Sequence, residues 1–327
     1  MKKPVVVMLQ LACALFAATA VQVPAAAAYP DRPVTFLVPY APGGGTDVYA
    51  RILADGLQQQ LKQSFVVENR AGAATQIAAS VLINAPADGH TIMMAAGTTL
   101  VVNPMIYKKL SYNADELAPV AMVGHSVFVL LANPSVPAKT LPELIAYIKS
   151  QPPGSLSYGT PGSGTPHHLF MEMLLSRIGA KMTQVPYRGS TPALTDVVAG
   201  NIPMMIVDLT PAQQLISEGR VRAFGITSPK RAKPAPDIPT LDEAGLPGYA
   251  GIAFNAVVTK KGTPKAIIDR LNKTITDHVK RPEITQKVYS SGIQPVTSTV
   301  EEFESFIADE KTKWSKVIAD AGIAKVD

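Results

Sequence analysis

The chain has 327 residues, of which 47% are hydrophobic and only 17% are charged, so it is too long and too apolar to be a disordered or fibrous polypeptide. A chain of this length predicts a large core that is divided between two domains. The net charge of +5 is small, and in the last third of the chain basic residues alternate with acidic ones, which argues against a nucleic-acid-binding surface.

The first 28 residues have the pattern of a secretory signal peptide. Two lysines precede an apolar run over residues 5–23, and three alanines at 26–28 form a small-residue cleavage site. Polar residues interrupt the run and no basic stop-transfer cluster follows it, so an exported protein is favoured over a membrane-anchored one. Cleavage after Ala28 removes Cys13, the only cysteine, and leaves a mature chain without disulfides or thiolate sites.

The mature chain alternates strand-like and helix-like segments. Strands are expected at residues 34–38, 65–67 and 91–94, with amphipathic helices at 47–62 and 76–84. A second series has strands at 127–131, 155–159, 202–207 and 221–226, and helices at 140–149, 165–178 and 191–200. From Pro264 onward the pattern is helical, and its apolar stripes, which include Phe303 and Trp314, are typical of core. This alternation predicts an α/β fold with mostly parallel sheets.

A glycine-rich loop joins the first predicted strand to the first helix, with the sequence Tyr40-Ala41-Pro42-Gly43-Gly44-Gly45-Thr46-Asp47. Three glycines let the backbone approach a ligand closely, and the free N–H groups of the following helix turn favour an anion. The loop matches neither a dinucleotide-binding fingerprint nor a Walker loop, so nucleotide phosphate is not indicated. A tight turn with Thr46 or Asp47 as the helix N-cap explains this loop equally well when it is considered alone.

A second glycine-hydroxyl loop, over residues 159–166, again lies between a strand and a helix. Two such loops in two series predict a cleft that binds a carboxylate or another small oxyanion, and the loops at 95–99 and 187–192 fit the same scheme. His167 and His168 follow the second loop but point in different directions within one helix turn, which argues against a metal site. Both should prefer the neutral form near the positive end of the helix dipole.

Several common catalytic motifs are absent from the sequence. We find no G-x-S-x-G elbow and no H-E-x-x-H pattern, and Ser163 lies between two glycines without the spacing of a nucleophile elbow. Nothing in the sequence requires a reaction or a cofactor. An exported hydrolase or transferase that uses Ser163 and His168 is nevertheless the main alternative to a binding protein.

The mature chain resembles the Bug family, the periplasmic solute-binding receptors of tripartite tricarboxylate transporters. The matching motifs, in chain order, are Tyr29-Pro30-Asp31-Arg32-Pro33, Pro39-Tyr40-Ala41-Pro42-Gly43-Gly44, Val67-Glu68-Asn69-Arg70, Ala87-Asp88-Gly89, Pro186-Tyr187-Arg188-Gly189, Pro192-Ala193-Leu194-Thr195-Asp196, Ile238-Pro239-Thr240, Glu243-Ala244-Gly245, Gly262-Thr263-Pro264 and Trp314. The resemblance implies a periplasmic, non-catalytic receptor with a two-lobed type II Venus flytrap fold. Such a receptor closes on a small carboxylate and delivers it to the membrane subunits of the transporter. A ligand-sensing partner of a membrane sensor kinase is a further alternative.

The resemblance also implies how the lobes and the site are assembled. We expect residues 29–124 and 226–327 to form one lobe and residues 125–225 to form the other, in a protein that acts as a monomer. The implied ligand-binding residues of the first lobe are Tyr40, Gly43, Gly44, Gly45, Thr46, Asp47, Thr98 and Asn103. Those of the second lobe are Gly162, Ser163, Gly164, Thr165 and His168, with Tyr187 and Asp208 at the border.

The chain departs from the family pattern at several of these positions. Gln76 stands where a small hydroxyl residue is common, and we count it among the ligand-binding residues. His167 stands where a small residue is usual, and Phe254 and Asn255 stand where a tryptophan and another aromatic residue are common. We therefore expect the carboxylate class to be shared with the family and the ligand's side-chain specificity to differ.

Overall fold

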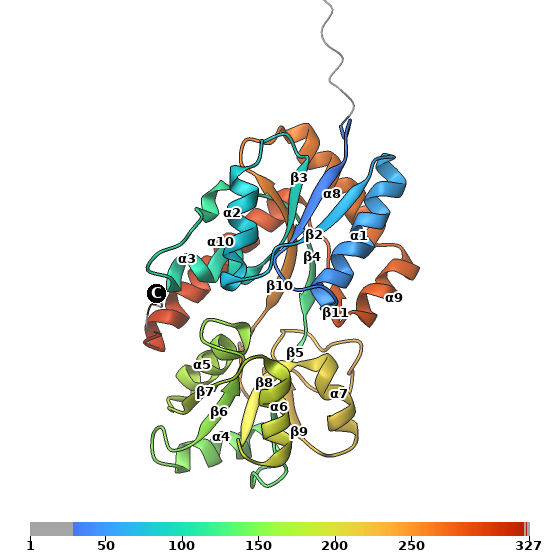
Figure 1. Cartoon of the computed structure of the whole chain (residues 1–327). Coiled ribbons are helices and arrows are strands. Elements are labelled where there is room, and N and C mark those ends of the chain that lie inside the picture. The colour runs from blue at the N-terminus through green and yellow to red at the C-terminus, as the bar shows by residue number, and fades with distance from the viewer. Residues whose placement is uncertain (1–28, 324, 326–327) are drawn as a thin grey trace, which may run out of the picture.

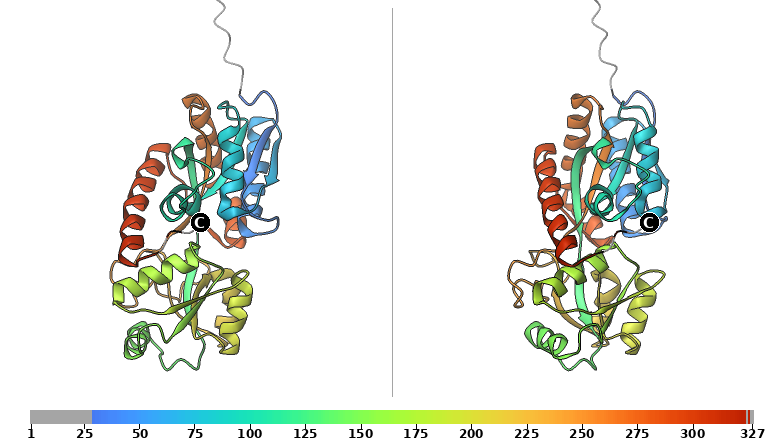
Figure 2. Two further views of the ribbon diagram at one scale, coloured as in Figure 1. Left: turned by 60° about the vertical axis from the view of Figure 1, so that its left-hand side comes forward. Right: turned by 90° about the vertical axis from the view of Figure 1, so that its left-hand side faces the viewer.

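The computed structural model describes residues 29–323 and residue 325, so the predicted signal peptide lies outside the described residues. The described chain forms two α/β lobes, drawn one above the other in Figure 1. The turned views of Figure 2 show the same division, with helices packed on both sides of each sheet. The two-lobed α/β fold expected from the sequence is therefore confirmed.

A six-stranded sheet forms the centre of the first lobe, with its strands in the order β11-β4-β10-β3-β1-β2. Strand β1 runs parallel to β2 and β3, whereas β10 is antiparallel to β3 and β4, and β11 is antiparallel to β4. The strands are β1 (Val34–Val38), β2 (Phe65–Asn69), β3 (Thr91–Ala96), β4 (Leu117–Ser126), β10 (Ala253–Lys260) and β11 (Ile293–Pro295).

A five-stranded sheet forms the centre of the second lobe, in the order β7-β6-β8-β5-β9. Strand β6 is parallel to β7 and β8, and β5 is antiparallel to β8 and β9. The strands are β5 (Phe128–Ala132), β6 (Ser157–Thr160), β7 (Thr183–Pro186), β8 (Met204–Asp208) and β9 (Arg222–Ile226).

Both sheets are mixed, which corrects the expectation of mostly parallel sheets. The reason lies in the two crossings between the lobes. The chain leaves the first sheet through β4 into β5, with only Val127 between them, and returns from β9 to β10 through residues 227–252. In the first sheet the outgoing strand β4 pairs with the returning strand β10, and in the second sheet β5 pairs with β9. Because one strand of each pair leaves its lobe where the other enters it, the two run in opposite directions. The lobe limits at 124/125 and 225/226 stay predictions.

Helices cover both faces of each sheet. In the first lobe α1, α8 and α9 pack on one face and α2, α3 and α10 on the other; in the second lobe α6 and α7 oppose α4 and α5. No helix within the described residues is long and apolar enough to cross a membrane. The helices are α1 (Gly45–Leu61), α2 (Gln76–Asn84), α3 (Asn103–Ile106), α4 (Leu141–Ser150), α5 (Pro166–Ile178), α6 (Ser190–Ala199), α7 (Leu209–Ser217), α8 (Lys265–Val279), α9 (Pro282–Ser290) and α10 (Val300–Asp320), with short 3-10 turns at Ala73–Thr75 and Ala114–Glu116 and a π-helical turn at Thr98–Val102.

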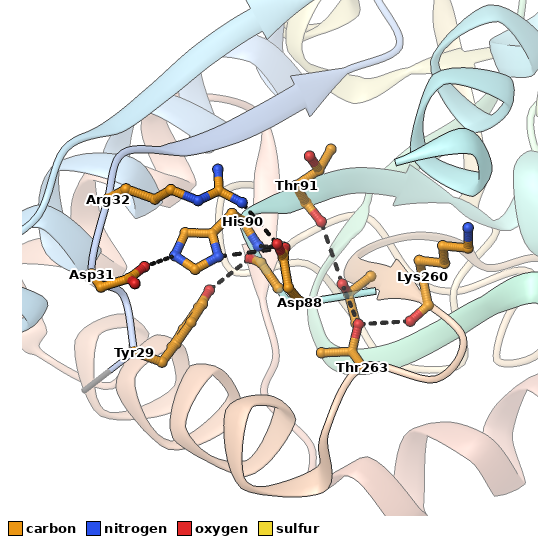
Figure 3. A network of polar contacts seen from close by, with 10 residues as sticks. Tyr29, Asp31, Arg32, Asp88, His90, Thr91, Lys260 and Thr263 are labelled. Atoms are coloured by element: carbon orange, nitrogen blue, oxygen red, sulfur yellow. Dashed lines mark hydrogen bonds and ion pairs between the residues drawn. The ribbon is translucent and has the colours of Figure 1, made fainter. Parts of the chain in front are cut away.

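A polar network holds the first described residues against the end of the first lobe that lies away from the second lobe (Figures 1 and 3). The Arg32 guanidinium lies 2.7 Å from the Asp88 carboxylate, and His90 Nε2 lies 2.9 Å from Asp31 Oδ1. The Tyr29 hydroxyl donates a hydrogen bond of 2.7 Å to the Gly89 carbonyl, between Asp88 and His90. Two of the motifs behind the family resemblance therefore meet here, where they stabilise the lobe and do not face the second lobe.

Candidate functional site

A cavity of about 330 Å³ lies between the two lobes, and both lobes contribute to its wall. Among the described residues, this wall contains one carboxylate, Asp208, and one histidine, His167, but no lysine or arginine. An anion bound here would therefore be held by hydroxyl groups, backbone N–H groups and helix ends, and not by a cationic side chain.

Three helices begin at the cavity. Thr46 lies in the first turn of α1, Thr165 is the N-cap of α5, and Asp208 is the N-cap of α7, and all three residues line the wall. The first N–H groups of a helix have no acceptor within that helix, and the helix dipole adds partial positive charge at the same end. The three helix starts therefore favour an anion in a cavity that has no cationic side chain.

The first glycine-rich loop contributes Tyr40 and Thr46 to the wall. Thr46 Oγ1 donates a hydrogen bond of 3.3 Å to Asn255 Oδ1, and Asn255 Nδ2 donates one of 3.1 Å to Ser126 Oγ. This chain of polar groups joins the start of α1 to β10 and to the end of β4. Asn255 is only 3% exposed, so its amide is fixed by these contacts at the edge of the cavity.

Tyr40 keeps its hydroxyl proton at physiological pH. The side chain is 36% exposed, but its hydroxyl group is crowded by protein atoms, and this desolvation, together with the negative charge of Asp208, raises the pKa of Tyr40 to about 12. The neutral hydroxyl can donate a hydrogen bond to an anion in the cavity.

The remaining predicted residues of this loop do not line the cavity, and of these Gly43 and Gly44 are exposed. Asp47 is buried and accepts hydrogen bonds from Gly43 N (2.9 Å), from Asn69 Nδ2 (2.9 Å) and from the Arg51 guanidinium (3.0 and 3.1 Å). Burial alone would raise the pKa of Asp47, but these donors outweigh it and lower the pKa. Gly44 is the N-cap of α1, and a side chain on Gly45 would collide with a backbone carbonyl of the turn that follows α9.

Thr98 and Asn103 lie in the wall as predicted residues of the first lobe, whereas Gln76 does not. Asn103 is fully buried, and its amide donates hydrogen bonds to the Ala74 carbonyl (2.7 Å) and to the Tyr112 hydroxyl (3.3 Å). Gln76 Oε1 accepts a hydrogen bond from a backbone N–H of the loop after α3. Both amides therefore hold neighbouring segments of the first lobe together.

The second glycine-rich loop contributes Ser163, Gly164 and Thr165 to the wall, whereas Gly162 and His168 do not line it. His168 Nδ1 accepts a hydrogen bond of 3.2 Å from Gly164 N, and Thr165 Oγ1 donates one of 2.7 Å to the Gly162 carbonyl. Burial lowers the pKa of His168 to about 4, so the ring is neutral and can act as this acceptor. The expectation of a neutral His168 is confirmed, and the histidine positions the loop from behind.

The two predicted border residues have different positions. The Tyr187 hydroxyl donates a hydrogen bond of 2.7 Å to Asp196 Oδ2, and Tyr187 does not line the wall. Asp208 does line it, and its Oδ2 lies 3.0 Å from His167 Nε2. His167 in turn packs edge-on against Phe128, with ring centroids 5.0 Å apart.

The aromatic part of the wall was not predicted from the sequence. Phe128, Phe170 and Trp314 all line the cavity, although their segments were interpreted only as buried strand, helix and core stripe. Their burial is correct, since each is at most 3% exposed, but their shared surface toward the cavity could not be seen in the periodicity. Phe254 and His167 also line the wall. Both depart from the family pattern, and this departure was the one feature of the sequence that pointed to them.

Comparison with known proteins agrees with this geometry. The family model of the "Tripartite tricarboxylate transporter family receptor" matches residues 49–323. The chain belongs to this family. Protein BugT of Bordetella pertussis is 35% identical over 296 residues, which cover 90% of this chain and 90% of that relative. The family is one of periplasmic solute-binding receptors, and its members are not classed as enzymes.

Two solved structures of similar receptors contain dicarboxylates. R. palustris Rpa4515 with adipate has a TM-score of 0.79 at 32% identity, and the match covers 91% of this chain and 100% of that one. MatC from Rhodopseudomonas palustris with bound malate has a TM-score of 0.72 at 29% identity, and the match covers 89% of this chain and 100% of that one.

Proposed function

We propose that this family member is a periplasmic receptor that captures a small carboxylate between its lobes and, acting as a monomer, delivers it to the membrane subunits of a tripartite tricarboxylate transporter. The observation that carries the proposal is the inter-lobe cavity, where three helix starts and several hydroxyl groups meet without a cationic side chain. The adipate and malate found with similar receptors support a carboxylate as the ligand. The signal-peptide pattern of residues 1–28 supports export.

The contacts of Ser163 and His168 favour binding over catalysis. Ser163 Oγ donates a hydrogen bond of 3.1 Å to Gln184 Oε1, and His168 Nδ1 accepts one from Gly164 N. A serine nucleophile needs a base within hydrogen-bond reach, but here each side chain has another partner. We therefore propose that the protein carries out no reaction on its ligand.

Screening carboxylates against the mature chain is expected to find one that raises the melting temperature. A ligand that binds only the folded protein stabilises it by about 2.7 kcal/mol at one hundred times its Kd. The matching primary amide should give little shift, because it has no anionic oxygens to present to the helix starts. Differential scanning fluorimetry on acid and amide pairs measures both effects. Equal shifts from acid and amide, or consumption of the acid during incubation, would contradict the proposed function.

Replacing Ser163 with alanine is expected to weaken binding of the best carboxylate from that screen by about tenfold at most. The change removes one neutral hydrogen bond, which contributes about 0.5 to 1.5 kcal/mol. Isothermal titration of the wild-type and Ser163→Ala proteins with this acid measures the difference. Detectable turnover by the wild type that disappears in Ser163→Ala would instead support the hydrolase alternative.

A further inference from the structure

The wall of the cavity has a polar part and an apolar part. Tyr40, Thr46, Ser126 and Asn255 supply hydroxyl and amide groups beside the start of α1, and two of the three hydroxyls are fixed through the Asn255 amide. The apolar part comes from the π-helical turn, α3, α5, α10 and the start of β10. Its side chains include Val102, Ile106, Leu169, Phe170, Phe254 and Trp314, and all of them belong to one hydrophobic cluster that extends through both lobes.

The helices of the apolar part lie on one side of the molecule. Figure 1 shows α3, α5 and α10 together on the left and α1 and α7 on the right, and the turned views of Figure 2 keep α5 and α10 adjacent. Helix α10 contacts both the π-helical turn and α5. A ligand with its charged group near α1 therefore has its other end directed toward apolar side chains.

Aromatic rings form a continuous run in this wall. The ring centroids of His167 and Phe128 are 5.0 Å apart, those of Phe128 and Phe170 are 5.3 Å apart, and those of Phe170 and Trp314 are 5.9 Å apart. The first two pairs meet edge to face and the last pair is stacked. The run crosses from the second lobe to α10 of the first, and all four rings line the cavity. Aromatic pairs at such separations are favourable, so a ring in the ligand would gain free energy by packing against this run.

The size of the cavity is sufficient for a ring and a carboxylate. An apolar cavity of about 150 Å³ can hold benzene, and this one has about 330 Å³. A second carboxylate placed against the apolar side chains would lack the hydroxyl and amide groups that surround the first one, and no lysine or arginine in the wall could replace them. An unpaired charge among apolar side chains is strongly unfavourable. A ring-bearing monocarboxylate fits this distribution better than a short dicarboxylate does.

We infer that the ligand is a carboxylate with an aromatic or similarly apolar body, because Phe128, Phe170 and Trp314 line the cavity as one run of rings. This inference rests on the proposed function. The carboxylate lies near the start of α1, and the body packs against the aromatic run of His167, Phe128, Phe170 and Trp314. The protein thereby selects aryl carboxylates against aliphatic dicarboxylates such as malate and adipate.

The single tryptophan provides a direct test. Trp314 is the only tryptophan of the chain and lines the cavity, so its fluorescence reports occupancy of the apolar part. We would titrate the mature chain with benzoate, phenylacetate and 3-phenylpropionate, and in parallel with malate and adipate. We expect at least one aryl carboxylate to change the emission and to bind about tenfold more tightly, or better, than either dicarboxylate.

A variant with a cation in the apolar part should shift this preference. Ile252 lines the wall and is half-buried, so Ile252→Arg can supply a partner for a second carboxylate without disrupting the core. We expect it to strengthen binding of adipate relative to phenylacetate by about tenfold, the effect of one charge-assisted pair. Ile77→Arg adds the same charge on an exposed face of α2 outside the wall and serves as the control.

The outcomes separate this inference from the proposed function. Tighter binding of malate or adipate than of every aryl carboxylate would overturn the inference and leave the carboxylate receptor in place. An unchanged preference in Ile252→Arg, relative to Ile77→Arg, would also overturn it. Binding of neither class, by fluorescence or by melting shift, would overturn the proposed function itself.

Discussion

Gly164→Ala is expected to weaken carboxylate binding by roughly 10- to 100-fold, because the added methyl group lies between the lobes. Gly164 belongs to the second lobe and lines the cavity, and a Cβ at this position would fall well inside contact distance of Ile106 Cδ1 in the first lobe. Overpacking of this kind costs about 1 to 3 kcal/mol, and separating the lobes relieves it. Under the proposed function the ligand-bound protein keeps the lobes in contact, so it loses free energy that the unbound protein can avoid losing by separating them. Isothermal titration with the best carboxylate measures the change in Kd.

Two further variants isolate the inter-lobe contact from backbone strain. Gly162 also has a positive φ (134°), as Gly164 does (76°), but nothing lies within 4 Å of a Cβ added there. Gly162→Ala should therefore introduce backbone strain without a new contact between the lobes, and we expect it to cause little loss of affinity. Ile106→Val removes the Cδ1 atom and should restore binding in the Gly164→Ala background. Equal losses in the two glycine variants, or no recovery in the double variant, would refute the steric argument.

Acidification from pH 7 to pH 4 is expected to lower the free energy of unfolding by several kcal/mol. Burial lowers the pKa of His168 to about 4, and burial together with the charge of Lys313 lowers the pKa of His125 to about 4. An unfolded histidine has a pKa of about 6.5, so between these values the unfolded state binds protons that the folded state does not. Stability is therefore full above pH 6.5 and falls as the pH drops toward 4, by up to about 3 kcal/mol for each histidine. Urea unfolding at a series of pH values measures this slope.

His168→Asn tests the contribution of the loop histidine. An asparagine Oδ1 can accept the Gly164 N–H in place of Nδ1, and it does not titrate. We expect the variant to keep carboxylate binding at pH 7 within about tenfold, the range of one hydrogen bond, and to show a shallower pH dependence of stability than the wild type. A slope equal to that of the wild type would show that His168 is not one of the groups responsible.

Much of the secondary structure could be predicted because it depends on local patterns. The strand at residues 34–38 and the helix at 76–84 have the predicted limits. The helix α4 begins where the sequence indicates, since Thr140 caps it by accepting the N–H of Glu143 and a proline occupies its first turn. Strands β4 and β10 were missed, and each pairs with segments far away in the sequence. Their strand conformation depends on partners that no local window contains.

In the candidate site, too, local patterns predicted some features and distant contacts decided the others. Glycines and hydroxyl residues between a strand and a helix predicted the loops that carry Tyr40, Thr46, Ser163, Gly164 and Thr165, and all five line the cavity. The sequence could not separate these five residues from neighbours in the same loops that do not line the cavity. Neighbouring residues in a loop have the same composition signal, and only long-range partners decide which way each one faces.

The sequence by itself determined the alternation of strands and helices, the glycine-rich loops and the family resemblance, because each depends on residues close together in the chain or on ordered motifs. Only the tertiary structure decided that the sheets are mixed, that Asp47 and His168 support the loops from behind, and that Phe170 stacks on Trp314. Periodicity shows that a side chain is buried but not which surface buries it. Trp314 was therefore correctly placed in the core from its pattern, and only the packing of α10 against α5 showed that it also faces the cavity.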